Sequence, residues 1–137
     1  MPTTSTMKPH FVNPLYLVEY DADHFYLEKD FSYVTLHLGF PWTVTVPAHE
    51  FPTDLASIPP LLRPFFKKFE ASEAAVIHDW LTYRNGHMNA KGLDNITRKD
   101  ADKIFLEAML VSDPPVPTST AKLMYRGVRF YSFWRRV

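Results

Sequence analysis

The segment "AAVIHDWLTYRNG", residues 74 to 86, places a histidine and an aspartate side by side within an otherwise apolar stretch. Four residues recur at the i, i+3, i+4, i+7 spacing of a single helical face: Ala74, Ile77, His78 and Leu81. We therefore expect a helix from Ser72 to about Arg84. His78 is expected to face the protein interior, and Asp79 to lie at the margin of the buried face, partly in contact with water.

A second helix supplies a carboxylate that can meet this histidine. Thr97, followed three residues later by Asp100, is typical of a helix N-terminus, and the helical period continues to about Val111. Asp102 lies next to the apolar stripe of this helix. If the two helices are antiparallel neighbours, Asp102 can accept a hydrogen bond from one ring nitrogen of His78 and leave the other nitrogen free to take a proton from water. That arrangement suits a general base; the alternative is a buried structural pair with no chemical role.

The N-terminal part of the chain has a different pattern. The segments "PLYLVEY", "FYLEKDF", "SYVTLHLGF" and "WTVTVP" are short, rich in aromatic and β-branched residues, and separated by Asp, Gly and Pro. They predict an antiparallel β-meander of three or four strands. A third helix is expected from about Ser119 to Trp134. We predict an α+β fold in one domain, residues 1–137, with a β-rich half (1–55) packed with about three helices in the second half (56–137).

Composition excludes several classes of function. Fifteen basic residues balance fifteen acidic ones, which removes the general electrostatic support for nucleic-acid binding. The absence of cysteine excludes thiol nucleophiles, disulfides and cysteine-bound zinc. The apolar runs are too short for a transmembrane segment, and the N-terminus lacks the apolar core of a signal peptide. We expect a protein that is cytoplasmic at synthesis.

A second polar cluster precedes the helical half. In "FPTDLASIPP", Asp54 and Ser57 stand among apolar and proline residues that hold the turn rigid. They either satisfy backbone groups of the turn or present a carboxylate and a hydroxyl to a site. In the functional alternative, Asp54 joins Asp79 as a ligand of a divalent cation or pairs with an arginine of the C-terminal helix.

Two aromatic clusters are candidate interfaces. In the C-terminal helix, arginines lie among aromatic side chains, a combination that suits a membrane surface, a nucleic-acid strand or a partner protein. The alternative is a packed helix with solvated arginines. The segment "LLRPFFKKF" either forms an exposed docking surface or closes over the core. The candidate interface residues are Leu61, Phe65, Phe66, Phe130 and Trp134.

Four ordered motifs, "FPTDLASIPPLL", "AAVIHDWLTYR", "RKDADKIFLEAML" and "AKLMYRGVRFYSFW", resemble a family of small phage and prophage proteins known as domain of unknown function 1353. The resemblance runs from about Val46 to Trp134. It implies a phage or prophage origin but no established activity. The residues to which it points are Asp54, Ser57, Pro59, His78, Asp79, Tyr83, Arg84, Asp102, Phe105, Met109, Tyr125 and Arg126.

The helical His-Asp pair is also similar to the sites of secreted phospholipases A2. In those enzymes the histidine activates water, the next aspartate binds calcium, and a distant aspartate orients the histidine; His78, Asp79 and Asp102 match in that order. This chain departs from the pattern because it has no cysteine and only four glycines, too few for a backbone calcium loop, and because Tyr83 follows His78 by five residues rather than four. The similarity supports the dyad more than a calcium site.

Two functional hypotheses follow. In the first, the protein is a phage hydrolase with His78 as general base, Asp102 as its orienting partner, and Asp79 with Asp54 as a cation or water site, acting on an ester, acyl or amide bond of the host envelope. In the second, it is a non-catalytic virion or tail-assembly protein with a buried His-Asp clasp. The first predicts a cleft at His78 and the second its full enclosure. The surplus of ionisable groups favours the hydrolase.

Partners and cofactors follow the same alternatives. We expect no cofactor beyond a divalent cation, and partners among phage structural proteins or components of the host envelope. The location is the host cytoplasm at synthesis, or the virion. Nucleic acid remains a third option only for the basic C-terminus.

Overall fold

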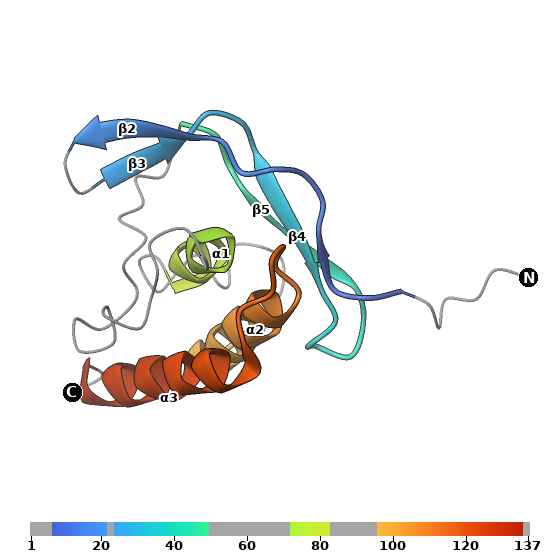
Figure 1. Cartoon of the computed structure of the whole chain (residues 1–137), viewed down its shortest axis with the longest axis vertical. Coiled ribbons are helices and arrows are strands. Elements are labelled where there is room, and N and C mark those ends of the chain that lie inside the picture. The colour runs from blue at the N-terminus through green and yellow to red at the C-terminus, as the bar shows by residue number, and fades with distance from the viewer. Residues whose placement is uncertain (1–6, 22–23, 50–71, 83–95, 136–137) are drawn as a thin grey trace, which may run out of the picture.

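The computed structural model describes residues 7–21, 24–49, 72–82 and 96–135, apart from the side chains of 19–25 and 131–135. Within these ranges the strands come first and the helices follow (Figure 1). The structure therefore confirms the α+β class with N-terminal antiparallel strands and three C-terminal helices.

The larger sheet is built on a hairpin of β4 (Phe31–Thr35) and β5 (Trp42–Val46). In β5, Val44 and Val46 are buried while the threonines between and before them are exposed, as expected of a strand with one buried face. Gly39 in the connecting turn has a φ of 90°, in the left-handed region that favours glycine.

Three shorter strands complete the β part. β1 (His10–Phe11) pairs with the other edge of β4, so that the sheet order is β1-β4-β5. β2 (Leu17–Asp21) and β3 (His24–Leu27) form a separate two-stranded antiparallel sheet. The described residues thus contain five strands in two sheets, where the sequence predicted three or four strands in one meander.

The short length of β1 and the hydrogen bonding around it explain why the sequence did not predict this strand. The strand has only two residues, too few to show an alternation. Pro14 has no N–H to continue the pairing. The side chain of Asn13 takes over instead: its Nδ2 donates to the carbonyl of Asp30 at 2.8 Å, and its Oδ1 accepts from the N–H of Ser32 at 3.0 Å.

The helices are α1 (Ser72–Thr82), α2 (Arg98–Leu110) and α3 (Thr118–Arg135), and α2 packs against both of the others. The predicted start of α2 is confirmed. Thr97 accepts a hydrogen bond from the N–H of Asp100, and the Asp100 carboxylate accepts one from the N–H of Thr97, both at 3.0 Å. No helix in the described ranges is both long and apolar enough to cross a membrane.

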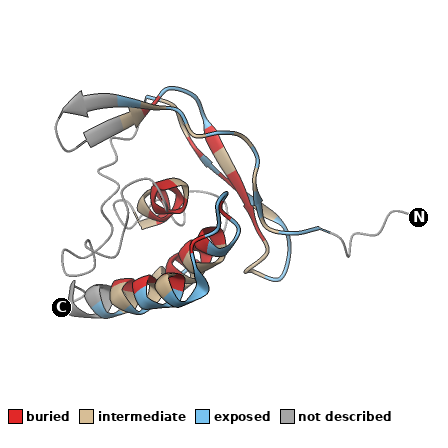
Figure 2. Ribbon diagram, in the orientation of Figure 1, coloured by how far each residue is buried: buried red, intermediate tan, exposed pale blue. Residues whose placement is uncertain are grey.

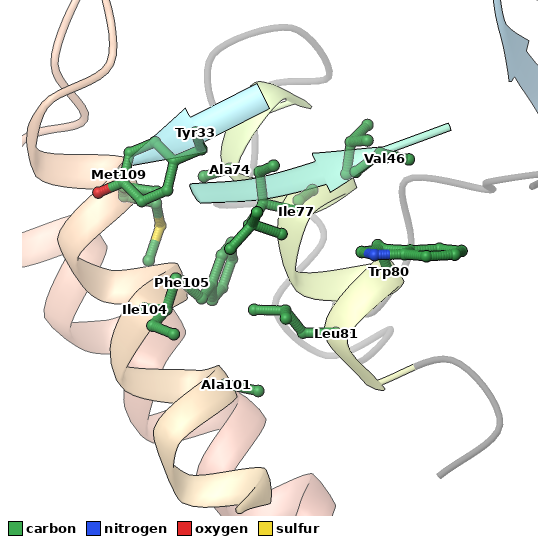
Figure 3. Close-up of a cluster of buried hydrophobic side chains, with 14 of the residues drawn as sticks. Tyr33, Val46, Ala74, Ile77, Trp80, Leu81, Ala101, Ile104, Phe105 and Met109 are labelled. Carbon is green, nitrogen blue, oxygen red and sulfur yellow. The ribbon is translucent and has the colours of Figure 1, made fainter. Parts of the chain in front are cut away.

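The core lies where β4 and β5 meet α1 and α2 (Figure 3). Tyr33 and Val46 of the sheet belong to the same hydrophobic cluster as Ile77 of α1 and Phe105 of α2, and all four are fully buried. Buried residues line the inner sides of the helices and the sheet (Figure 2). The apolar stripe of α2 next to Asp102 is buried throughout: Ala101, Ile104, Phe105 and Ala108.

Glu107 attaches α2 to the sheet by three hydrogen bonds. Its Oε1 accepts from the hydroxyls of Tyr33 and Thr35, each at 2.7 Å, and its Oε2 accepts from the N–H of Leu36 at 3.3 Å. Burial, together with the Glu107 carboxylate, raises the pKa of the Tyr33 hydroxyl well above its ordinary value. The tyrosine therefore remains a neutral donor.

We predict that Glu107→Gln lowers the free energy of unfolding by about 1–3 kcal/mol, because an amide offers one acceptor oxygen to three donors. Urea denaturation of the two proteins measures the difference. Glu28→Gln, at an exposed position, is the matched control and should change stability by less than about 0.5 kcal/mol. Equal stability of Glu107→Gln and the wild type would show that these bonds do not hold α2 to the sheet.

Candidate functional site

His78 lies on the buried face of α1. The small and apolar residues around it, including Ala74, Ile77 and Leu81, make this face of the helix fit against α2. The exposed fraction of His78 is 0%, and its ring lies 4.8 Å from the ring of Phe105, centre to centre. The predicted inward orientation of His78 is therefore observed.

Asp102 of α2 is the partner of His78. The distance between Nε2 of His78 and Oδ1 of Asp102 is 2.6 Å, and Asp102 is also completely buried. An ionised carboxylate can only accept hydrogen bonds, so Nε2 carries the hydrogen and donates it. In the neutral ring the lone pair then lies on Nδ1, the other nitrogen.

Nδ1 of His78 is buried, and no hydrogen-bond partner for it lies among the residues that the structure describes. An unpaired polar atom in a protein interior costs about 1–3 kcal/mol and calls for an explanation, such as a water molecule or a chemical role. Because the two nitrogens lie on different sides of the ring, Nδ1 points away from the carboxylate that holds Nε2.

Two arginines complete the surroundings of Asp102. Nη1 of Arg129, from α3, donates to Oδ2 at 2.8 Å, and Nε of Arg98, one turn earlier in α2, lies 3.5 Å from Oδ1. Their side chains are 31% and 36% exposed, whereas the carboxylate is not exposed at all. The site is therefore a buried Asp102 carboxylate with Arg129 at Oδ2 and with Arg98 and His78 at Oδ1.

These contacts determine the protonation states. Burial alone would raise the pKa of the Asp102 carboxyl, but His78, Arg98 and Arg129 together hold it below its ordinary value. Burial lowers the pKa of His78, and the charge of Arg98 acts in the same direction, against the opposing effect of Asp102. At neutral pH the pair is therefore an anionic carboxylate and a neutral imidazole, the form in which a histidine can accept a proton.

The structure places only part of the predicted cluster. Asp79 is partly exposed and follows His78 in α1, at the margin where it was expected. Tyr125 is partly buried, with the ammonium of Lys103 4.8 Å from its ring centre, and Arg126 is exposed. Eight other predicted residues lie outside the described ranges: Asp54, Ser57, Pro59, Leu61, Phe65, Phe66, Tyr83 and Arg84.

Two of the candidate interface residues, Phe130 and Trp134, lie on α3, and the structure describes the side chain of Phe130 only. Phe130 is 64% exposed. Trp134 belongs to α3, but its side chain is outside the described set. Phe105 and Met109, to which the family resemblance points, are fully buried core residues.

A metal site receives no support from the described part of the chain, which contains no group of three or more His, Cys, Asp or Glu side chains able to hold an ion. The predicted cation site at Asp79 and Asp54 remains a prediction because Asp54 is not described.

The two arginines are the site residues that sequence reasoning missed. Arg98 stands four residues before Asp102 in the same helix, a spacing that indicates an ion pair, and it could have been found from that signal. Arg129 could not, because its pairing with Asp102 depends on how α3 packs on α2. The sequence left the arginines of the C-terminal helix as solvated side chains, as contacts to a membrane, nucleic acid or partner protein, or as a partner of Asp54.

The chain matches the family described as protein of unknown function (DUF1353) over residues 25–128, which include His78 and Asp102. It is also 40% identical over 119 residues to the uncharacterized protein y4iH of Sinorhizobium fredii (strain NBRC 101917 / NGR234), an alignment that covers 85% of this chain. The chain spans 43% of the length of that relative. No solved structure shows a significant match.

We predict that His78 makes the protein less stable in mild acid. The pKa of His78 lies below its ordinary value of 6.5 in the folded state, so the unfolded chain takes up a proton that the buried ring resists. The free energy of unfolding should fall as the pH decreases from 6.5 towards that lower pKa. His78→Gln, whose amide can still donate to Asp102, should lose less stability over this range in urea denaturation.

His10→Gln is the control for this pH series because His10 is exposed. It should reproduce the wild-type slope. A wild type that gained stability on acidification relative to His78→Gln would contradict the lowered pKa of His78.

Proposed function

This chain belongs to the DUF1353 family, and we propose that it is a hydrolase in which His78 is the general base and Asp102 positions it. The proposal depends on one observation: Nε2 of His78 is bound to a carboxylate, while the buried Nδ1 has no partner among the described residues. A purely structural histidine would be expected to satisfy both nitrogens, because the unpaired one costs free energy. A base needs this division between one held nitrogen and one available nitrogen.

The proposed reaction begins with a water molecule hydrogen-bonded to Nδ1 of His78. Buried waters commonly bind polar groups that lack a protein partner. Nδ1 takes one proton as the water oxygen attacks the carbonyl carbon, and the ring becomes an imidazolium. The Asp102 carboxylate stabilises that cation through Nε2. The imidazolium then returns the proton to the leaving oxygen or nitrogen as the bond to carbon breaks.

The substrate class follows from the similarity of His78, Asp79 and Asp102 to the phospholipase A2 arrangement. We propose an ester, acyl or amide bond of a host envelope as the target, in a phage or prophage setting. Asp79, which is partly exposed beside His78, would hold a second water molecule or a divalent cation together with Asp54.

A second candidate function is favoured by a different observation. His78 and Asp102 are both completely buried, which matches the enclosure expected of a clasp and not the cleft expected of a hydrolase. Such a clasp would join α1 to α2 and, through Arg129, to α3. In this alternative the chain is a non-catalytic component of a virion or of its assembly. The two candidate functions rest on the same geometry, and they differ in whether Nδ1 of His78 accepts a proton from water.

The replacement His78→Gln separates them. Glutamine places an amide N–H near the position of Nε2 and removes the basic nitrogen. We predict that the wild type hydrolyses members of a panel of aryl esters and amides, assayed with Ca²⁺, with Mg²⁺ and with a chelator. The rate in His78→Gln should fall by about 10²-fold or more, while the free energy of unfolding at pH 7.5 changes by less than about 1 kcal/mol.

His10→Gln serves as the control and should retain the wild-type rate. Unchanged hydrolysis in His78→Gln, or no hydrolysis of any substrate by the wild type, would overturn the proposed activity. The clasp alternative predicts no His78-dependent hydrolysis. It also predicts that His78→Leu, which cannot donate to Asp102, destabilises the fold by about 1–3 kcal/mol more than His78→Gln does.

A further inference from the structure

The third helix carries an excess of positive charge in a chain whose charges balance. Over its eighteen residues, α3 contains four basic residues and no acidic one. It lies along one edge of the molecule, with buried residues on its side towards the other helices and exposed residues on its outer side (Figures 1 and 2). Of its basic side chains that the structure describes, Lys122 and Arg126 are exposed, whereas Arg129 pairs with Asp102.

Among the described residues, the three carboxylates of the neighbouring helix α2 pair with one cation of α3, Arg129, and otherwise bind residues outside α3. Asp100 binds Thr97 and lies 3.1 Å from Nε2 of His37. Asp102 is buried against His78 and binds Arg129, and Glu107 binds the β4 strand through hydroxyl groups. The acidic groups of α2 are thus used within the protein.

The remaining cations of the two helices form stripes. Lys99 and Lys103 stand four residues apart on α2, and Lys122 and Arg126 stand four residues apart on α3, so each pair lies on one face of its helix. The two stripes adjoin because the ammonium of Lys103 reaches the ring of Tyr125 across the helix pair. Lys99, Lys122 and Arg126 are exposed, and Lys103 is partly exposed.

Large apolar side chains lie among these cations. Leu123 and Phe130 are 39% and 64% exposed, and with Arg126 they follow the i, i+3, i+7 spacing of one helical face. We call Lys99, Lys103, Lys122, Leu123, Arg126 and Phe130 the basic face. Basic residues mixed with exposed Leu and Phe are typical of helices that lie in a membrane interface. A nucleic-acid surface would use the aromatic ring for stacking but has no use for the leucine.

We propose that the basic face binds peripherally to a bilayer that carries anionic headgroups. The cations lie against the headgroups while Leu123 and Phe130 enter the boundary with the acyl chains. This binding does not depend on His78 and stands whether or not the chain is a hydrolase.

Sedimentation with vesicles tests the proposal on the whole chain. Vesicles of phosphatidylcholine with phosphatidylglycerol at about one lipid in three should bind the protein, whereas pure phosphatidylcholine should not. Lys122→Gln/Arg126→Gln should weaken binding roughly twentyfold or more, at about fivefold for each lost cation. Leu123→Ser/Phe130→Ser should remove the part of the binding that persists at about 0.5 M salt, where surface charges are screened.

The matched control is Lys8→Gln/Lys29→Gln, which removes two cations from the N-terminal part of the chain. It should bind as the wild type does, and circular dichroism should show the same helix content in all variants. Equal binding to neutral vesicles, no binding at all, or equal weakening by the control would overturn the proposal. Tighter binding to a single-stranded oligonucleotide than to anionic vesicles, lost in Lys122→Gln/Arg126→Gln, would also overturn it and identify nucleic acid as the partner.

Discussion

Asp102 is the carboxylate on which the helical half of this protein depends. An ionised group without any exposure to water is costly unless charges and hydrogen bonds compensate it. The compensation comes from three different helices: His78 from α1, Arg98 from α2 itself and Arg129 from α3. These contacts favour the observed packing of the three helices, because a shift that separated them while Asp102 stayed buried would leave its charge unpaired.

The same constraint gives the site its chemical asymmetry. The carboxylate binds one nitrogen of His78 and so fixes which nitrogen carries the hydrogen. The hydrogen bond from His78 and the two arginines keep the pKa of Asp102 low enough for it to stay ionised, and burial keeps the imidazole neutral. In the proposed hydrolase, the unpaired Nδ1 is the atom that distinguishes a general base from a structural clasp. Complete enclosure of the His78 ring favours a structural role, and the unpaired Nδ1 favours a catalytic one. A water molecule bound at Nδ1 would be compatible with either role.

The inner and outer sides of α2 and α3 use charge in different ways. On the inner side, carboxylates and cations cancel in short contacts that hold elements together, as Asp102 does with Arg129 and Glu107 with the β4 hydroxyls. On the outer side, no ion pair with a described carboxylate is formed by Lys99, Lys103, Lys122 or Arg126, and exposed apolar side chains lie among these cations. A chain with no net charge can thus present a locally basic surface, because the carboxylates of α2 are bound by His37, Arg129 and the β4 hydroxyl groups.

Much of this arrangement follows from local sequence. Helical periodicity alone places His78 and Asp102 on inward faces, and the spacing of Thr97 and Asp100 predicts the start of α2, because these features depend only on residues within one or two turns. Short-range patterns also predict four of the strands but not β1, whose pairing with β4 depends on residues far along the chain. Tertiary packing alone decided the rest. The pairing of Arg129 with Asp102, the attachment of Glu107 to the sheet and the complete burial of His78 each join residues more than 20 positions apart or depend on several elements at once. No local period encodes such contacts, because they exist only after the helices and the sheet have closed around one core.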